Sequence, residues 1–274
     1  MEENKKVILT GLIFILIVAA GVAAYFLFFR KGGGESRAEA LAEQPVQAAQ
    51  EESLRGPEEL GEFAQIELDQ SDGIVRDLAR ELSSHPKLAR WLMSGDLVRR
   101  FVAAVDNVAN GMSPRSQMDF FSSTGEFKTV KRGKDDILDP ESFRRYDDIA
   151  DAFLSLNTGD AVRLYRQLKP LFQKSYQELG YPGQDFDQTL FRAIVELLKV
   201  PVIDHEIKLK KDVVTYVFAD PSLENMSEAQ KHLIRMGSEN AHIIQEKLRE
   251  VALELGFSAE RLPRPKDYIP EYEP

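Results

Sequence analysis

The stretch LVRRFVAAVDNVANG, residues 97–111, decides the fold class. Its apolar residues recur every three or four positions, so in a helix they share one face and the charged residues take the other. Gly111 follows the last apolar residue, where a glycine commonly ends a helix. Such a helix is stable only when its apolar face packs against other elements, so the stretch predicts a helical domain.

Helical spacing continues on both sides of this stretch. Helices are predicted over 71–82, from His85–Pro86, from Asp139–Pro140, from Asn157 or Thr158 to Gly180, over 185–199, and in two segments separated by Gly237. Side chains that can accept a hydrogen bond from the first turn stand at most of these starts. The serines assigned to helix caps in this way are Ser71, Ser94, Ser227 and Ser238.

One short segment alternates instead. Ile207 and Leu209 alternate with charged residues, and the β-branched and aromatic run Val213–Phe218 follows a charged turn. We expect a β-hairpin there, and residues 127–131 could form one more short strand. The predicted fold class is therefore mainly α: one helical domain over 71–258 with a small β-hairpin.

The amino-terminal region is predicted to be a membrane anchor. Residues 7–29 run for 23 positions without a charge, and as a helix they would span about 35 Å, enough for a bilayer core. The alternative is a cleaved signal peptide, since small residues occupy 19–24. The apolar run continues through Phe29, however, and that length favours a retained anchor within 1–31. Orientation stays open, because the cations on the two sides nearly balance.

Between anchor and domain, residues 32–70 are rich in Ala, Glu and Gln. From Glu35 to Gln70 ten acidic residues face only two arginines, and few apolar residues are available to offset the entropy of ordering. We predict an acidic tether that holds the domain on the order of 35 Å from the membrane. After the domain, residues 259–274 contain four prolines and are predicted to form an extended tail.

Composition excludes several functions. The chain has no cysteine, which removes disulfides, thiolate metal sites and cysteine nucleophiles. Its formal net charge of -10 argues against a general nucleic-acid binder, because that affinity comes from cations at phosphates. Gly32–Gly34 lacks the strand and the Gly-Lys-Ser/Thr of a phosphate loop, and no Gly-x-Ser-x-Gly occurs.

Three segments resemble a known family. These are YRQLKPLFQKSYQELGYPG (165–183), FADPSLENMSEAQKHLIRMGSENA (218–241) and the stretch at 97–111. Together they resemble a bacterial domain-of-unknown-function family found on proteins with one N-terminal transmembrane helix, over roughly residues 71–250. The resemblance implies a helical domain tethered to the bacterial inner membrane and facing the periplasm. It carries no catalytic residues, because the family has no assigned activity.

Residues that could carry acid–base or metal chemistry are few. The four histidines lack the His-x-x-x-His spacing of zinc hydrolases, so no metal site or cofactor is expected. The densest carboxylates occupy a helix face opposite the apolar stripe, which favours a solvated surface. The alternative of a hydrolase predicts that Asp106, Asp148, His232 or Glu239 gather in one pocket. The histidines are His85, His205, His232 and His242, and the carboxylates are Asp147, Asp148, Asp151 and Asp160.

Arginines and aromatic residues supply the candidates for interaction. Arginine forks suit carboxylates and phosphates, so a shared patch could meet a protein or an anionic envelope polymer. The alternative is that each arginine pairs with a neighbour such as Asp96, Asp148 or Asp160. Aromatic residues could line a groove or simply fill the core. The arginines are Arg99, Arg100, Arg144, Arg145, Arg163 and Arg166, and the aromatic residues are Trp91, Tyr165, Tyr176 and Tyr181.

These observations favour a non-enzymatic interaction or scaffold domain, anchored by one helix in the bacterial inner membrane. An envelope hydrolase with an unrecognised site and a cytoplasm-facing anchor for a soluble partner are the alternatives. The sequence leaves the partner, the oligomeric state and the biological process open.

Overall fold

The structure is a computed structural model that describes residues 63–117, 125–213, 215–268 and 270, all within the compact unit Leu54–Pro274. The predicted anchor at 1–31, with its span at 7–29, lies outside the described residues, as does the tether up to residue 62. Among the described helices, none is both long and apolar enough to cross a bilayer.

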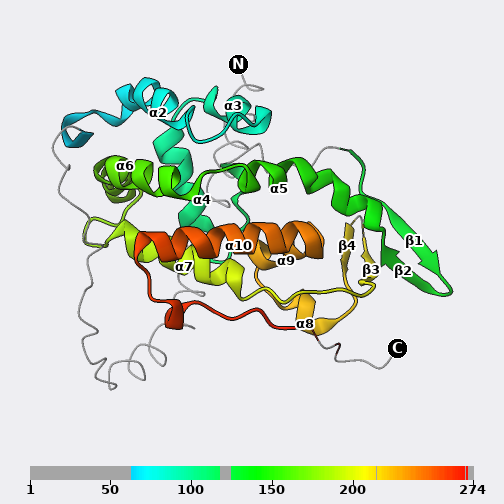
Figure 1. Cartoon of the computed structure of the whole chain (residues 1–274). Coiled ribbons are helices and arrows are strands. Elements are labelled where there is room, and N and C mark those ends of the chain that lie inside the picture. Colours follow the sequence, from blue (N-terminus) through cyan, green and yellow to red (C-terminus); the bar gives the residue numbers. More distant parts are fainter. Residues whose placement is uncertain (1–62, 118–124, 214, 269, 271–274) are drawn as a thin grey trace, which may run out of the picture. The chain divides into compact units, whose positions relative to one another are not determined.

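The described part of the chain is mainly helical, with nine α-helices and one small antiparallel sheet (Figure 1). The prediction of a mainly α domain is therefore confirmed. The α-helices are α2 (Ser71–Ala79), α3 (Pro86–Leu92), α4 (Leu97–Ala109), α5 (Asp147–Leu154), α6 (Thr158–Glu178), α7 (Phe186–Leu198), α8 (Pro221–Glu224), α9 (Glu228–Ile234) and α10 (Ser238–Leu255). Single 3-10 turns or short 3-10 helices cover Phe63–Gln65, Leu68–Gln70, Pro114–Ser116, Pro140–Tyr146 and Ala259–Arg261.

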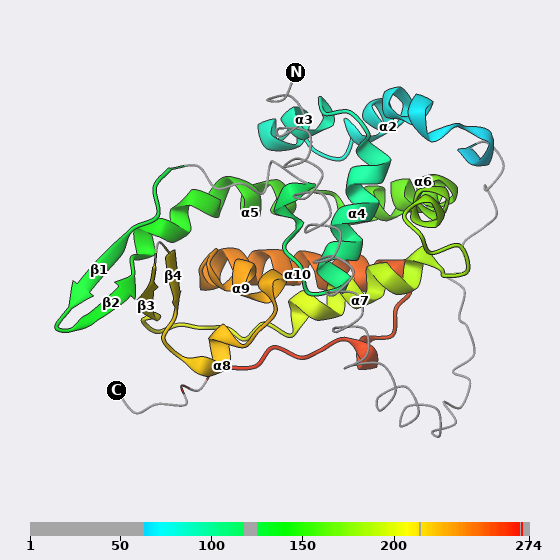
Figure 2. The ribbon, with the colours of Figure 1, turned by 180° about the vertical axis from the view of Figure 1, so that it is seen from behind.

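Two apolar cores meet along α10. The larger lies between α2, α4, α6, α7 and the end of α10, and the smaller joins the sheet and α5 to α8, α9 and the start of α10. Partly buried Leu197 and Leu248 pack against both cores. Figures 1 and 2 show the same arrangement from opposite sides, with α4 crossing α7 and the sheet beyond the start of α10.

The sheet has four strands, where the sequence predicted one hairpin and one possible short strand over 127–131, which overlaps β1. β3 (Lys208–Asp212) and β4 (Thr215–Phe218) form the expected hairpin, with Leu209 opposite Phe218. A second hairpin, β1 (Thr129–Arg132) and β2 (Asp135–Leu138), adds to it through β2, in the order β1-β2-β3-β4. The sequence did not predict β2 because it is only four residues long, with two aspartates followed by two apolar residues, and so shows no alternation.

Besides His85 at the start of α3, four of the predicted helix starts are confirmed by side chains that accept a hydrogen bond from the first turn. Asp139, Asn157 and Asp185 accept from the backbone N–H two or three residues on. Ser227 forms a full capping box with Gln230, in which each side chain accepts from the other residue's N–H. All four interactions join residues at most three positions apart, which is why local sequence predicts them.

Three serines predicted as caps play other parts. Ser71 is already inside α2, and its hydroxyl donates to the carbonyl of Leu68. Ser94 lies too far before α4 to cap it, because α4 begins at Leu97 and its first N–H groups bond to a residue of α2. Ser238 opens α10 behind Gly237, with no side-chain cap at that end. The assignments of Ser71, Ser94 and Ser238 as caps are therefore wrong.

α4 takes its cap from a distant residue. The Asp72 carboxylate accepts hydrogen bonds from the backbone N–H of Asp96 and of Leu97, both at 2.8 Å. Asp96 itself has a left-handed φ of 57°, which turns the chain sharply between α3 and α4. A carboxylate also suits the positive end of the α4 dipole, so this contact fixes α4 relative to α2.

Ordered packing extends beyond the predicted limits of the domain. Leu68, in the region predicted as tether, is buried in the larger core, and Leu262, in the predicted tail, joins the same core. Residues 266–268 pair with Val202 through backbone hydrogen bonds of 3.0 and 3.1 Å. Both segments carry a few apolar side chains among charged ones, and these apolar side chains pack against the helices.

Candidate functional site

An apolar cavity of about 290 Å³ lies between the helices of the larger core. α2, α3, α4, α5, α6, α7 and α10 all contribute walls, because each turns part of its apolar face toward the same space. Among the described residues, Lys247 is the one charged side chain in the lining. Representative wall residues are Leu88, Trp91, Phe101, Leu164, Leu190 and Leu248.

A second apolar cavity, of about 190 Å³, adjoins the first. Its walls come from α4, α7, α9 and α10, together with Phe153 of α5. The two cavities share the side chains that separate them, so a rotamer change in that partition could join them. The shared residues are Phe101, Phe153, Leu190, Ile194 and Leu248.

The size of these cavities is functionally informative. Protein interiors contain few voids larger than a water molecule, and an engineered apolar cavity of about 150 Å³ binds benzene. A closed, empty void of 290 Å³ would cost up to about 7 kcal/mol, comparable to the whole stability of a domain. Partly buried Leu82, Leu88, Leu164 and Val251 bring the wall of the larger cavity to the surface. A hollow of this kind is suited to taking up an apolar group.

The charged edge of the larger cavity is at Lys247. Its Nζ donates to the Leu156 carbonyl and the Thr158 hydroxyl, both at 3.2 Å, and to the Glu250 carboxylate at 2.8 Å. Glu250 is 55% exposed and the Lys247 side chain 12% exposed, so the ammonium lies just beneath the surface, where the apolar wall meets an exposed carboxylate. The same ion pair lowers the pKa of Glu250.

His232 lines the smaller cavity and is 9% exposed. Its Nδ1 is 2.9 Å from the Ser113 hydroxyl, and its Nε2 has no hydrogen-bond partner among the described residues. Burial lowers the pKa of His232 to about 4, and the positive charges of Arg115 and Arg235 act in the same direction. The imidazole is therefore neutral near pH 7, and the smaller cavity carries no charge.

A buried polar cluster supports one wall. The Tyr165 hydroxyl donates to the Asp187 carboxylate at 2.5 Å, and Lys169 Nζ donates to the other oxygen at 2.5 Å. Burial, followed by the charge of Asp187, raises the pKa of Tyr165 well above 10. Asp187 is therefore a compensated charge that fixes α7 to α6, and Tyr165 keeps its proton.

The aromatic candidates divide between cavity and core. Trp91 and Tyr165 line the larger cavity. Tyr176 is fully buried, with its hydroxyl 2.8 Å from that of Thr189, and the Tyr181 ring stacks on it at 4.5 Å between centroids. Tyr165 is also buried in the core, so Trp91 is the one of the four that lines the cavity without being a buried core residue.

The residues considered for catalysis do not converge. Asp148 and Glu239 are exposed, whereas Asp106 and His232 are buried. Asp106 is 3.4 Å from the Tyr181 hydroxyl, and Asp148 is 3.5 Å from Lys87. His232 is the only member of this set that lines either cavity.

The other carboxylates and histidines serve local structure or face solvent. Asp147 accepts from the Asn240 amide at 3.0 Å, and Asp151 is exposed. His85 caps α3, His205 stacks on Tyr268, and His242 is exposed. In the part of the chain that the structure describes, no three His, Asp or Glu side chains are grouped so that they could hold a metal.

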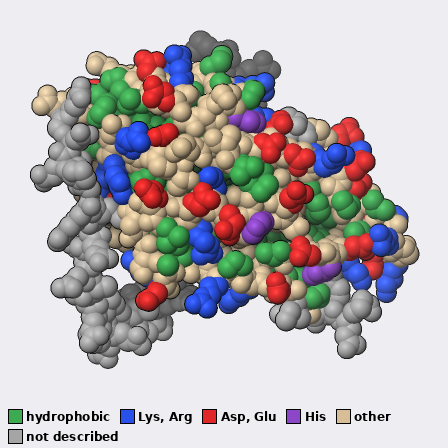
Figure 3. Space-filling model, viewed as in Figure 1, with side chains coloured by type: hydrophobic (Ala, Val, Ile, Leu, Met, Phe, Trp, Pro, Cys, Tyr) green, Lys and Arg blue, Asp and Glu red, His purple; other side chains and the backbone are tan. Residues whose placement is uncertain are grey.

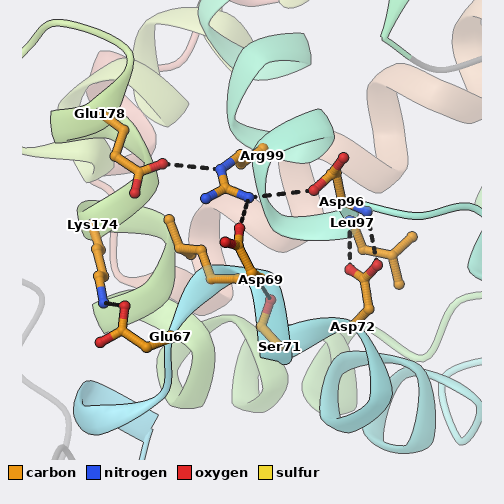
Figure 4. A network of polar contacts seen from close by, with 10 residues as sticks. Glu67, Asp69, Ser71, Asp72, Asp96, Leu97, Arg99, Lys174 and Glu178 are labelled. Carbon is orange, nitrogen blue, oxygen red and sulfur yellow. Dashed lines mark hydrogen bonds and ion pairs between the residues drawn. The ribbon is translucent and has the colours of Figure 1, made fainter.

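Arg99 is the centre of an acidic network rather than a free cation (Figure 4). Its guanidinium contacts Asp69 at 2.7 Å, Glu178 at 2.9 Å and Asp96 at 3.3 Å. Hydrogen bonds to Glu178 and Asp69 are the main causes that raise its pKa. Beside it, Lys174 contacts Glu67 at 2.7 Å. Acidic residues predicted to lie in the tether are thus held on α4 and α6.

The remaining arginines are spread over several elements. Arg100 donates to the Gln117 carbonyl at 3.3 Å. Arg163 pairs with Asp160 at 2.9 Å, and Arg166 donates to the Glu254 carbonyl at 3.0 Å. Arg145 lies over the rings of Phe127 and Tyr146, and Arg144 is exposed beside it. The face in Figure 3 accordingly shows acidic and basic side chains interspersed.

Sequence reasoning missed the cavities, which are the most distinctive feature of the described domain. Their walls come from residues that the helical periodicity correctly assigns to the core. Whether such residues touch or leave a gap depends on how helices far apart in sequence are spaced. The one available signal is the unusual number of predicted helices that present apolar faces to a common centre.

Comparison with known proteins gives one result. Residues 97–252 match the model of a family described as a protein of unknown function (DUF3014). No curated protein and no solved structure matches the chain. The matched region includes α4 to most of α10, and hence the greater part of both cavity walls.

Proposed function

Because the chain belongs to the DUF3014 family, whose function is unknown, we propose a function from its own residues: a membrane-tethered, non-catalytic binding domain. In this proposal the binding site is the pair of apolar cavities between the helices. The observation that carries it is the size and chemistry of the larger cavity, about 290 Å³ with a single charged residue in its described lining. Ligand pockets are typically apolar hollows of this order that open to the surface.

Membrane tethering is supported by the sequence. Residues 7–29 have the length and composition of a transmembrane helix, and cations flank both ends. An apolar cavity on a domain held near a bilayer has a nearby source of apolar ligands. Location in the bacterial inner membrane, with the domain in the periplasm, is part of the proposal and is supported by the resemblance noted above.

A non-catalytic role is supported by the chemistry of the cavity walls. Acid–base catalysis needs positioned groups that can exchange protons with a substrate. The titratable residues in the two linings are Lys247, whose ammonium is held at the rim, Tyr165, which is bonded to Asp187, and neutral His232. The distances among Asp106, Asp148 and their partners give no support to a hydrolase.

Membrane attachment and orientation can be tested together. Alkaline phosphatase and a fluorescent protein would be fused separately after Pro274 of the full chain, and membranes would be washed with alkaline carbonate. The proposal predicts that the chain resists extraction, and that the phosphatase fusion is active while the fluorescent fusion is dark. Extraction by carbonate would refute the tether, whereas fluorescence with inactive phosphatase would refute the periplasmic location.

A further inference from the structure

We propose that the two cavities bind the alkyl chain of a single-chain carboxylic amphiphile, a long-chain fatty acid, with its carboxylate at the Lys247 rim. This inference rests on the proposed function and names its ligand class.

The cavity volumes select one chain. The cavities measure about 290 and 190 Å³, and benzene fits a cavity of about 150 Å³. By that scale the two together hold about nineteen carbon atoms. One long alkyl chain has this size, and the two chains of a phospholipid do not fit.

The shape of the space also favours a chain. The cavities adjoin at the partition formed by Phe101, Phe153, Leu190, Ile194 and Leu248. A flexible chain can pass the partition once one or two of these side chains change rotamer. A partner helix cannot enter, because it is about 10 Å wide; at most, single side chains of a partner protein could reach inside.

The polar contacts are concentrated at one end. Lys247 Nζ, the Thr158 hydroxyl and the Leu156 carbonyl form an edge at which the apolar wall meets the surface. The Thr158 hydroxyl already donates to the Glu250 carboxylate at 2.9 Å, so the Lys247 ammonium is the donor that a ligand carboxylate would meet at this edge. The smaller cavity, at the other end, is lined by neutral residues and suits a methyl terminus. A carboxylate at Lys247 would share the ammonium with Glu250.

The test uses the full chain in lipid nanodiscs, because detergents are themselves single-chain amphiphiles and would compete. The probe is palmitic acid with a photoreactive diazirine on its chain, and peptide mass spectrometry locates the crosslinks. We expect crosslinks in α4, α6, α7 and α10 at wall residues such as Phe101, Leu164 and Leu248, and we expect unlabelled palmitate to abolish them. Crosslinks confined to residues outside the walls, or indifferent to unlabelled palmitate, would overturn the inference.

Ala161 offers a substitution that fills the larger cavity. It lies in the wall on α6, so the ring of Ala161→Phe would take the place of several methylene groups. Each methylene that can no longer be buried lowers affinity about fourfold, so wall crosslinking should fall about tenfold or more. Ala89→Phe is the control, since Ala89 is exposed on α3 and lines neither cavity. Equal crosslinking in both variants would contradict the proposed site.

Folding of each variant is checked by circular dichroism and thermal melting. If Ala161→Phe fails to fold, Leu164→Trp fills the same space from one turn further along α6. Lys247→Met keeps the aliphatic wall and removes the ammonium, so it should weaken crosslinking by palmitic acid and spare that by the matching long-chain alcohol. Equal effects on both probes would overturn the placement of the carboxylate.

A phospholipid that carries the same diazirine chain separates the two sources of alkyl chains. We expect the phospholipid to give no crosslinks at the cavity walls that unlabelled lipid abolishes. Strong crosslinks of that kind would show that the site takes membrane lipid instead of a free acid. The proposed function has a separate readout. If the full chain stays in nanodiscs and binds a small apolar probe such as benzene while palmitate fails, the ligand class is wrong and the binding domain stands.

Discussion

At the scale of single residues, two positions constrain which amino acid can occupy them. Gly237 separates α9 from α10 and has a φ of 87°, a region that L side chains rarely adopt. His232 on α9 is buried and neutral, and the positive charges of Arg115 and Arg235 disfavour its protonation. The sequence predicts the helix break at Gly237, but not the close approach of Phe143 to it or the burial of His232, because these depend on what the rest of the fold places around each residue.

Gly237→Ala should destabilise the domain. A Cβ at this position would lie 2.6 Å from a ring carbon of Phe143, closer than packed carbon atoms can approach. Strain and repacking together predict a loss of about 2 kcal/mol or more in the free energy of unfolding, measured by urea denaturation. Gly183→Ala is the matched control, since a Cβ there meets nothing within 4 Å. Equal stability of the two variants would contradict this account of Gly237.

His232 should make stability depend on pH. Its pKa is about 4 in the folded protein, against the ordinary histidine value of 6.5, so the unfolded chain binds the proton more tightly. Above pH 6.5 this histidine costs no stability. As the pH drops from 6.5 toward 4, the free energy of unfolding falls by up to about 3 kcal/mol. Urea denaturation at pH 7.5 and 5 should show a smaller pH effect in His232→Gln than in the wild type. His242→Gln, at an exposed histidine, should retain the full effect.

At the scale of elements, helix starts separate what local sequence predicts from what it does not. Four helices have local caps that were predictable: the side chains of Asp139, Asn157, Asp185 and Ser227 each accept from an N–H group two or three residues on. The start of α4 was not, because its N–H groups are satisfied by Asp72, more than twenty residues earlier.

Asp72→Ala should therefore weaken the start of α4 as well as its contact with α2. Loss of a helix cap costs about 0.5–2 kcal/mol, and here two backbone N–H groups lose their acceptor. We expect a loss near the upper end of that range by urea denaturation. Asp77→Ala is the control on the same helix, because Asp77 is 76% exposed and contacts only Arg80 at 3.3 Å among the described residues. If the two variants lose equally little, Asp72 does not cap α4.

At the scale of the whole molecule, the sequence predicts the helical class and most core positions. Apolar spacing places six residues on one face of α4, and five of them are buried while Phe101 is partly buried: Leu97, Val98, Phe101, Val102, Val105 and Val108. The same spacing cannot tell a side chain in close contact from one that lines a hollow. For that reason both cavities, and with them the candidate site, emerge only from the packing of helices in three dimensions.

The candidate arginines illustrate the same limit. A pair such as Arg99–Arg100 looks like a cationic patch in sequence, but Arg99 is surrounded by Asp69, Asp96 and Glu178. Two of these acids are 30 and 79 positions away, so no local pattern indicates them. Residues far away in the sequence thus decide whether an arginine is paired, just as they decide whether an apolar face is closely packed or lines a cavity.

The central claim is that the described domain contains an apolar binding cavity, and xenon tests it most directly. Xenon enters apolar cavities without any specific polar contact, so its position in crystals under pressure is independent of the ligand proposed above. We predict xenon density between α4, α6 and α10, beside Phe101 and Leu164, and its loss in Ala161→Phe. A space filled by protein side chains, with no xenon among these helices, would contradict the account.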